Sequence, residues 1–321
     1  MLYIIRSDYF MCPYILEPLQ SMEGIRFIMF ERDRLPFLTK IKRFLRAFII
    51  RKKGLWTNLF YNERIIREIS EIKPDDKVLF FSIENLKELL ILDKEIPAKK
   101  RSVYIWNPVA TINRNLFSRA EYFVFMHLLN MNILTFDKDD ARKYRFSFAN
   151  QVYKYPAKSL HQKEVVANSV FFIGQDKYRS RRLAKLAIML TSAGAQPVFY
   201  ILKGKHTVEE PTLKVFYHDV GMNYANVLEY IQRSSCLLEI VQKGQSGITL
   251  RTLEALFCQK KLITNNKAVK DYDFYHPNNV FIYTDETDTN DVKAFLLSPY
   301  VPISKEITDN YEIETWIKQF V

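Results

Sequence analysis

The stretch 237–266, LLEIVQKGQSGITLRTLEALFCQKKLITNN, connects an apolar run that predicts a β-strand to an amphipathic helix and then to a second apolar run. Two of the chain's eight glycines, Gly244 and Gly247, lie in the polar loop between the first strand and the helix. In an open parallel sheet, ligands bind beyond the carboxyl ends of the strands, where loops lead into helices. The stretch therefore predicts a parallel α/β sheet with a ligand site at this loop.

The start of this helix has the chemistry of an anion site. Free backbone N–H groups and the positive end of the helix dipole attract phosphate, and glycine lets the backbone approach a ligand closely. Ser246 or Thr249 is expected to cap the helix. Arg251 and Glu254 are expected on its polar side, where arginine suits a diphosphate and glutamate suits two ribose hydroxyls. The alternative is an ordinary ion pair on an exposed helix face.

The same alternation of strands and helices extends along the chain. Runs that are apolar on both sides, separated by helices, predict parallel sheets covered on both faces. In the helical stretch 181–193, four apolar residues share one face: Leu183, Leu186, Ala187 and Leu190. The predicted strands are 2–6, 25–31, 78–82, 102–106, 133–137, 169–174, 197–202, 213–218, 236–241, 261–264 and 280–283.

A chain of 321 residues exceeds the usual size of one core, which favours two domains. The polar stretch 155–168 marks the boundary between two Rossmann-like domains, 1–158 and 159–321. The final segment 311–320 predicts a helix whose apolar face covers the second domain's core or, alternatively, returns to the first domain. That face comprises Ile313, Trp316, Ile317 and Phe320.

The net charge of +11 is unevenly distributed. Lys and Arg number 28 against 18 Asp and Glu in residues 1–158, and 19 against 18 in residues 159–321. A basic first half indicates an anionic partner, for which nucleic acid, a membrane surface and an acidic lipid or polysaccharide are candidates.

Several classes of protein do not fit the sequence. The three cysteines have no paired spacing, which indicates a reducing compartment and argues against structural zinc. The five histidines show no metal spacing. No apolar run approaches the ~20 residues of a spanning helix, and no signal peptide is predicted. We expect a cytoplasmic protein.

The run GQSGITLRTLEALFCQKKLITNN closely resembles the donor-binding segment of GT-B glycosyltransferases, particularly the bacterial enzymes of lipopolysaccharide and capsule biosynthesis. In those families a glycine-containing loop leads into a T-x-R-x-x-E-A helix, and a strand follows. The likeness spans most of residues 100–285 and includes FFIGQDKYRSRRLAKLA (171–187), YIWNPV (104–109) and LTFDKDDARKY (134–144). The matching positions are Gly247, Thr249, Arg251, Glu254, Ala255 and 261–264.

The resemblance implies two Rossmann-type domains with parallel sheets facing each other across a cleft. The second would bind a nucleotide-activated sugar, with Glu254 on the ribose and Arg251 on the diphosphate. The first would bind a saccharide or lipid-linked acceptor of surface polysaccharide synthesis. No cofactor and no metal ion are implied. The implied donor site is Gly174, Lys177, Arg179, Glu239, Gln245, Ser246, Gly247, Thr249, Arg251 and Glu254.

One feature departs from the resembled families. Many retaining GT-B enzymes carry two glutamates with seven residues between them, whereas Ser246 stands at the first of these positions. Both retention and inversion of the sugar's stereochemistry are therefore open, and no catalytic base is singled out.

Other motifs allow two interpretations each. Gly174, Lys177 and Arg179 at a helix start either bind a diphosphate or form a solvated basic surface. The aspartates of FDKDD (136–140) mimic a metal-binding Asp-x-Asp, but at the start of a helix they are expected to cap it. The predicted acceptor-side residues Trp106, Asn107 and His127 either line the cleft or are structural: Trp106 and Asn107 in a turn, His127 in a helix near the core.

Residues 37–53, FLTKIKRFLRAFIIRKK, predict a helix with one apolar and one basic side. Such helices lie at anionic bilayer surfaces, which would place the protein at the inner face of the inner membrane. The alternative is a helix packed on the sheet with a solvated basic face.

Two rival functions come from other classes. One is a nucleic-acid-binding protein on a Rossmann scaffold, suggested by the basic half, but no recognition motif supports it. The other is a non-catalytic protein that binds sugar nucleotides or polysaccharide. We favour the glycosyltransferase and expect no nucleic acid as partner.

Overall fold

The computed structural model describes residues 1–30, 63–112, 116–157, 164–205, 207–241 and 246–321. It divides into two compact units, of which unit 1 comprises Met1–Asn150 and Ile313–Val321, and unit 2 comprises Gln151–Glu312. The division falls at Asn150, and the boundary expected at 158 lies outside the described residues. The predicted basic helix 37–53 also lies outside them.

Unit 1 contains a six-stranded sheet of order β2-β1-β3-β4-β5-β6, in which every neighbouring pair is parallel. The strands are β1 (Leu2–Ser7), β2 (Ile25–Phe30), β3 (Lys77–Phe81), β4 (Lys100–Ile105), β5 (Asn132–Thr135) and β6 (Ser147–Phe148). The helices are α1 (Met11–Leu16), η1 (Glu17–Ser21), α4 (Glu63–Ser70), α5 (Leu86–Glu95), α6 (Val109–Ile112), α7 (Leu116–Leu128) and α8 (Lys138–Tyr144).

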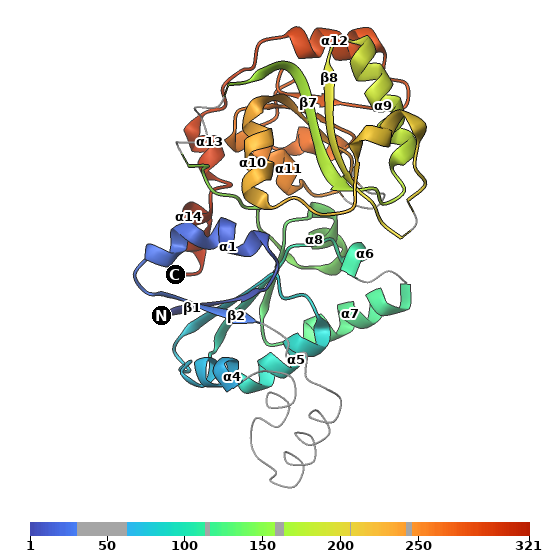
Figure 1. Cartoon of the computed structure of the whole chain (residues 1–321). Coiled ribbons are helices and arrows are strands. Elements are labelled where there is room, and N and C mark those ends of the chain that lie inside the picture. The colour runs from blue at the N-terminus through green and yellow to red at the C-terminus, as the bar shows by residue number, and fades with distance from the viewer. Residues whose placement is uncertain (31–62, 113–115, 158–163, 206, 242–245) are drawn as a thin grey trace. The chain divides into compact units, whose positions relative to one another are not determined.

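The two faces of this sheet are covered by different parts of the chain. Helices α4, α5 and α7 cover one face, and their buried apolar residues form a core with inward residues of the strands, such as Ile5 and Phe80. Helix α1 lies on the other face (Figure 1). The C-terminal segments α14 (Ile313–Trp316) and η5 (Ile317–Gln319) also pack there, with Trp316 against Phe81 and Tyr104.

Unit 2 contains a second six-stranded parallel sheet, of order β12-β11-β10-β7-β8-β9. Its strands are β7 (Val166–Gln175), β8 (Gln196–Leu202), β9 (Tyr217–His218), β10 (Ser234–Glu239), β11 (Lys261–Thr264) and β12 (Val280–Ile282). Its helices are α9 (Ser180–Ser192), η3 (Pro211–Phe216), α10 (Tyr224–Arg233), α11 (Leu250–Phe257), η4 (Lys267–Asp271), α12 (Thr289–Leu297) and α13 (Lys305–Asp309).

Hydrophobic patterning explains how these helices pack. In α9, the apolar residues predicted to share one face are all buried, and α9 packs beside α12 on one face of the sheet. Helices α10 and α11 pack against β10, and Figure 1 shows them on the other side. Both faces are therefore covered, as expected for parallel strands without polar alternation.

The predicted fold class is confirmed, with two differences in the strands. The predicted strand 213–218 is mostly the 3-10 helix η3, and only Tyr217–His218 joins the sheet. Pro211 lies in the first turn of η3, and Val215 is 80% exposed, so this apolar run is not a buried strand. The short edge strand β6 was not predicted, because its residues are exposed and show no apolar run.

Candidate functional site

The strand order of unit 2 locates a ligand site. Counted from β7, the order matches the 3-2-1-4-5-6 arrangement of dinucleotide-binding sheets, in which the direction of strand progression reverses between the first and fourth strands. Those strands are β7 and β10. Ligands bind at the carboxyl ends of strands at such a reversal. The loops that follow β7 and β10 are the two that the sequence analysis singled out.

The loop after β7 is held by Arg179. Its guanidinium donates to the carbonyls of Asp176 (3.2 Å), Gln175 (2.5 Å) and Ile240 (2.5 Å), so it ties this loop to the end of β10. It also lies over the ring of Phe172, and burial lowers the pKa of Arg179 to about 10. Much of its hydrogen-bonding capacity is thus used to hold the loop together.

A glycine near the end of β7 makes room for that arginine. A Cβ atom on Gly174 would lie 3.0 Å from Nη2 of Arg179. Lys177 and Tyr178 follow with φ angles of 43° and 63°, in the left-handed region that non-glycine residues rarely adopt. Both side chains are exposed, Tyr178 to 81%. The loop therefore presents Lys177 and Tyr178 outward at the strand reversal.

The carboxylate of Glu239, at the end of β10, is hydrogen-bonded to neighbouring side chains of the protein. Its carboxylate is buried and accepts hydrogen bonds from the hydroxyls of Thr252 (2.9 Å), Thr264 (2.5 Å) and Thr249. These three threonines come from α11, β11 and the helix cap. Glu239 therefore fixes the start of α11 relative to the sheet, and its oxygens are turned to the protein.

Helix α11 begins as predicted, with Thr249 as its N-cap accepting a hydrogen bond from the backbone N–H of Arg251 (3.0 Å). Of the preceding loop, Gln245 lies outside the described residues. Ser246 is half-buried, and Gly247 is buried with its carbonyl accepting from Nδ2 of Asn266 (3.1 Å).

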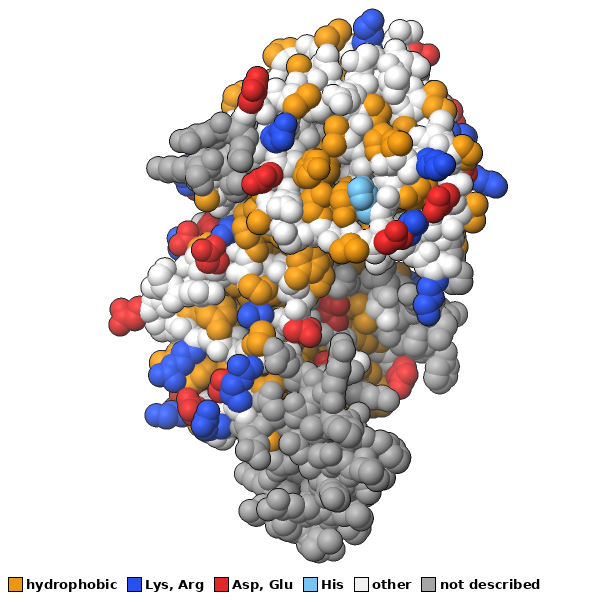
Figure 2. All heavy atoms as spheres, in the orientation of Figure 1, with side chains coloured by type: hydrophobic (Ala, Val, Ile, Leu, Met, Phe, Trp, Pro, Cys, Tyr) orange, Lys and Arg blue, Asp and Glu red, His pale blue; other side chains and the backbone are white. Residues whose placement is uncertain are grey.

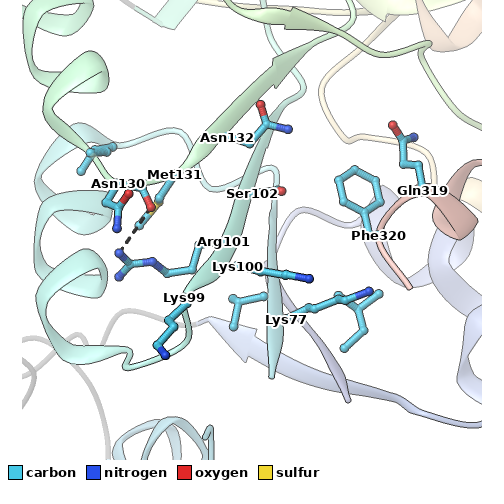
Figure 3. Close-up of a pocket in the computed structure, with 13 residues that line it drawn as sticks. Lys77, Lys99, Lys100, Arg101, Ser102, Asn130, Met131, Asn132, Gln319 and Phe320 are labelled. Carbon is cyan, nitrogen blue, oxygen red and sulfur yellow. Dashed lines mark hydrogen bonds between the residues drawn. The ribbon is translucent and has the colours of Figure 1, made fainter. Parts of the chain in front are cut away.

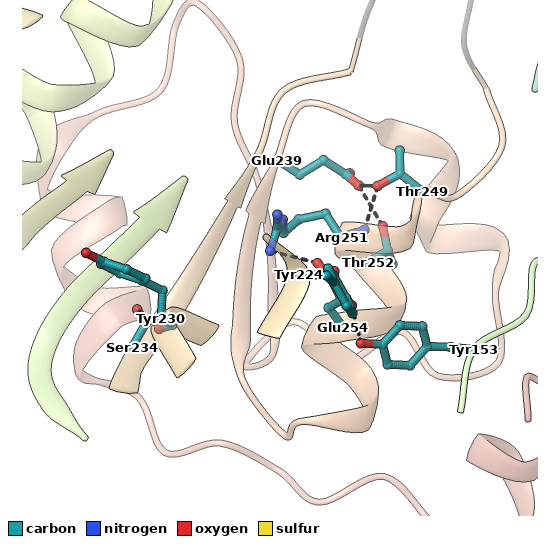
Figure 4. A network of polar contacts seen from close by, with 9 residues as sticks. All are labelled: Tyr153, Tyr224, Tyr230, Ser234, Glu239, Thr249, Arg251, Thr252 and Glu254. Atoms are coloured by element: carbon teal, nitrogen blue, oxygen red, sulfur yellow. Dashed lines mark hydrogen bonds and ion pairs between the residues drawn. The ribbon is translucent and has the colours of Figure 1, made fainter. Parts of the chain in front are cut away.

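Arg251 and Glu254 form an ion pair of 2.7 Å between Nη1 and Oε2 (Figure 4). The alternative of an ordinary ion pair on an exposed helix face is wrong: Glu254 is 3% exposed, and the first residue of α10, Tyr224, covers it. The Tyr224 hydroxyl donates to Oε1 of Glu254 (2.7 Å) and is itself hydrogen-bonded to the hydroxyl of Tyr153. The guanidinium of Arg251 lies over the ring of Phe171, 5.6 Å from its centroid.

This buried pair is only partly satisfied. Nη1 of Arg251 and Oε2 of Glu254 are both buried, yet the contact between them does not have hydrogen-bond geometry and neither atom has another partner. Burial raises the pKa of Glu254, opposed by the charge of Arg251 and the Tyr224 hydrogen bond. A buried ion pair with poor geometry contributes little to stability.

In unit 1, a carboxylate that the sequence analysis missed lies beside two predicted residues. Glu84 follows β3, and its carboxylate accepts from the backbone N–H groups of Trp106 (2.6 Å) and Asn107 (2.7 Å) and from Nδ2 of Asn107 (2.9 Å). Burial raises the pKa of Glu84 against these three hydrogen bonds. Its position directly after the apolar run of β3 was the available signal, since ligand-binding residues follow strands of this kind.

The strand order of unit 1 places this cluster at a second reversal. In the order β2-β1-β3-β4-β5-β6 the reversal lies between β1 and β3, and Glu84 follows β3. Tyr9 and Phe10 follow β1 and are 44% and 61% exposed. Tyr9 contacts Trp106, which is buried, whereas Asn107 is exposed. Trp106 and Asn107 therefore lie together at the carboxyl edge of the sheet.

His127 does not join them. It lies in the last turn of α7, close to the start of β5 and therefore at the amino ends of the strands. Its Nδ1 is 2.8 Å from the carbonyl of Phe123, and its side chain is exposed, so the expectation of a histidine near the core is also wrong.

The first aspartate of FDKDD caps helix α8, as predicted. Asp137 caps α8 by accepting from the backbone N–H groups of Asp139 (2.9 Å) and Asp140 (3.1 Å). Asp139 pairs with Arg142, and Asp140 accepts from the N–H of Val109 (2.7 Å). Within the described residues, no group of three His, Cys, Asp or Glu side chains is placed to hold a metal ion.

The chain is similar to known proteins in its fold but not in its sequence. No protein-family model and no curated protein sequence matches the chain. Its structure is similar to that of an alpha,alpha-trehalose-phosphate synthase (UDP-forming) from Burkholderia vietnamiensis, with a TM-score of 0.62 and 10% identity over 99% of this chain and 98% of that one. The chain has the GT-B fold. This confirms the fold that the donor-segment resemblance implied.

Two further structures share the GT-B fold. One is an E. coli structure, trehalose-6-phosphate bound with UDP-2-fluoro glucose, with a TM-score of 0.56 and 8% identity over 98% of this chain and 94% of that one. The other is AviGT4, a glycosyltransferase involved in avilamycin A biosynthesis, with a TM-score of 0.50 and 8% identity over 98% and 93%. Among the residues that the structure describes, no helix is both long and apolar enough to cross a membrane.

Proposed function

We propose that the protein is a glycosyltransferase that uses a nucleotide-activated sugar. The GT-B fold, matched over almost the whole chain, carries this proposal, and glycosyltransferases and a structure bound with UDP-2-fluoro glucose are among its neighbours. The glycine loop and the Arg251–Glu254 pair beside the strand reversal of unit 2 support it independently.

In this proposal Arg251 and Glu254 bind the donor. The ribose hydroxyls donate to Oε2 of Glu254, which lacks a well-aligned hydrogen bond in the free protein, and Arg251 turns to the diphosphate. The backbone at the start of α11, with Gly247 and Ser246, faces the phosphates at the positive end of the helix dipole. Lys177 on the loop after β7 adds a cation, whereas Arg179 and Glu239 hold the site in shape.

The acceptor binds at the carboxyl edge of unit 1. Glu84, Trp106 and Asn107 are the residues there with the required chemistry, since a carboxylate and an amide accept and donate to sugar hydroxyls. We propose a saccharide or lipid-linked acceptor of bacterial surface polysaccharide synthesis, such as lipopolysaccharide or capsule. Contact of residues 37–53 with the anionic inner face of the inner membrane would bring the enzyme to a lipid-linked acceptor.

Departure of the nucleoside diphosphate is proposed to need no metal ion. The helix N-terminus and the basic side chains stabilise the developing negative charge. Activity is therefore expected to be unchanged when EDTA is added to the assay.

Donor binding is tested by thermal shift against UDP, ADP, GDP and their glucose conjugates. At 100 times its dissociation constant, a ligand stabilises by about 2.7 kcal/mol. Arg251→Lys and Glu254→Gln keep most of the shape of the pair and are expected to weaken binding at least tenfold. The matched controls Arg181→Lys and Glu210→Gln alter a pair of the same unit, with Arg181 exposed and Glu210 half-buried, and should bind as the wild type does.

Two results would count against the proposal. If no nucleotide in the panel stabilises the protein, the donor site is wrong. If a nucleotide sugar binds, but no labelled sugar is transferred to lipid-extracted or saccharide acceptors, the non-catalytic binding protein is favoured instead.

A further inference from the structure

A basic cavity lies at the edge of unit 1 opposite Glu84. It has a volume of about 530 Å³ and is bordered by the first residues of four strands: Leu2, Lys77, Lys100 and Asn132. Ligands of α/β sheets bind at the carboxyl ends of strands, whereas this cavity lies at the amino ends. It is therefore separate from the site proposed for the acceptor.

Two lysines lie side by side in this cavity. Lys77 and Lys100 are register partners on the adjacent parallel strands β3 and β4, so their side chains leave the same face of the sheet. Like charges directly opposite each other destabilise a sheet. The nearby carboxylates already have partners: Asp76 pairs with the amino terminus (3.2 Å) and Asp93 with Arg101 (3.0 Å). Among the described residues, neither lysine has an ion pair.

The other walls of the cavity combine polar side chains with the apolar side chains of Leu2, Val78, Leu129 and Met131. Ser102 and Asn132 are register partners that follow Lys100 on the same face. The C-terminal segment lies opposite them with Gln319 and Phe320 (Figure 3). In Figure 3 the side chains of Lys77, Lys100, Ser102 and Asn132 point toward that segment. Figure 2 shows Lys and Arg side chains gathered at the edge of unit 1 where the strands begin.

We propose that this cavity binds an anionic saccharide through its phosphate or carboxylate group. The anion lies between Lys77 and Lys100 and removes their mutual repulsion, since each ammonium donates to it. The hydroxyl group of Ser102 and the amide groups of Asn132 and Gln319 form hydrogen bonds with the sugar hydroxyls. The volume is within the range of small-molecule sites and accommodates a short oligosaccharide.

The chemistry of the lining favours a saccharide over a lipid headgroup. Ser102, Asn132 and Gln319 supply hydrogen-bonding groups beside apolar lining residues, and Phe320, the aromatic residue of the lining, is 9% exposed and packs on Trp316. A competing explanation is that the lysines complement the negative ends of helices α5 and α7, which finish at this edge of the sheet. That role needs no ligand.

Titration calorimetry of the full chain distinguishes these possibilities. The probes are trigalacturonate, inorganic phosphate, the neutral maltotriose, and vesicles of phosphatidylglycerol. Trigalacturonate and phosphate are expected to bind the wild type, with an affinity that falls as salt is added. The double variant Lys77→Gln/Lys100→Gln should bind trigalacturonate at least tenfold more weakly. The control Lys185→Gln/Lys293→Gln removes two exposed lysines of unit 2 and should leave binding unchanged.

Stability without ligand gives a second readout. Because the repulsion is removed, the melting temperature of Lys77→Gln/Lys100→Gln should equal or exceed that of the wild type. A lower melting temperature together with unchanged trigalacturonate binding would overturn the proposal in favour of the helix-end role. Binding to the vesicles alone would overturn it in favour of a membrane surface. Nucleotide binding to unit 2 should be the same in both double variants, so failure here is distinct from failure of the proposed function.

Discussion

At the scale of single residues, the raised pKa of Asp140 allows a prediction of how stability changes with pH. It is 8% exposed at the start of α8 and accepts from the N–H of Val109 (2.7 Å). Burial, with a contribution from Asp137, raises its pKa to about 6. The folded state therefore holds a proton on Asp140 in a pH range where the unfolded chain has lost it.

This shift predicts the sign of a pH dependence. Because the folded pKa exceeds the unfolded value, the stabilising contribution of Asp140 is fully present below about pH 4 and is lost as the pH rises through about 6. The loss amounts to about 2–3 kcal/mol, at 1.36 kcal/mol for each pKa unit. Asp140→Asn should flatten this part of the profile in urea unfolding followed by tryptophan fluorescence. Asp75→Asn, an exposed carboxylate, should retain the slope.

Gly174 gives a prediction that rests on space alone. An added Cβ would lie 3.0 Å from the Arg179 guanidinium, which is anchored on the carbonyl of Ile240. Gly174→Ala should therefore lower the free energy of unfolding by roughly 1–3 kcal/mol, as overpacking does. Gly221→Ala is the control, because a Cβ there meets nothing within 4 Å. The free energy of unfolding of both variants is measured by circular dichroism in urea. Equal stability would show that the Arg179 side chain moves aside without a measurable cost.

At the scale of elements, the C-terminal segment contributes much of one face of unit 1. Trp316 is 5% exposed and packs edge-on against Phe81 and Tyr104, at centroid distances of 6.1 and 4.8 Å. Trp316→Ala should cost about 3–5 kcal/mol of stability because it leaves a large cavity. Trp316→Phe should cost only about 1 kcal/mol, since the buried indole N–H has no partner to lose. Chemical denaturation followed by circular dichroism measures both, with exposed Leu297→Ala as control.

Patterns that are local in the sequence predicted most of the elements. The apolar runs located ten of the twelve strands, and the spacing of Leu183, Leu186, Ala187 and Leu190 located α9 and its buried face. The run 213–218 failed because single-sequence apolarity does not distinguish a strand from a short 3-10 helix whose side chains are largely exposed. Strand order could not be predicted, since it depends on pairing between distant segments.

The candidate site was predicted less completely for the same reason. The cap at Thr249 and the contact between Arg251 and Glu254 follow from helical spacing within one segment. That Tyr224 covers Glu254 depends on the packing of α10 beside α11, which no local pattern encodes. Glu84 reaches Trp106 and Asn107 through a fold-back of the chain, and Arg179 is turned to Ile240, far away in sequence.

At the scale of the whole molecule, the two units are expected to unfold in separable steps. Unit 2 contains no tryptophan, whereas Trp106 and Trp316 lie in unit 1, so their fluorescence reports on unit 1 and circular dichroism reports on both units. A nucleotide bound to unit 2 stabilises only the unit that holds it. UDP should therefore raise the melting transition seen by circular dichroism and leave the fluorescence transition in place. Coincident shifts by both probes would contradict independent units.

The path of the chain through the two units has a consequence during protein synthesis. Unit 1 begins with the first strand but is complete only with residues 313–321, which cover the face that carries Phe81 and Tyr104. All of unit 2 is translated before those residues appear. Domains generally fold from the N-terminus as they are synthesised, but unit 1 cannot complete its fold before all of unit 2 has been translated. The later unit is the first to have its whole sequence available, and the earlier one waits with an uncovered aromatic surface that chaperones would recognise.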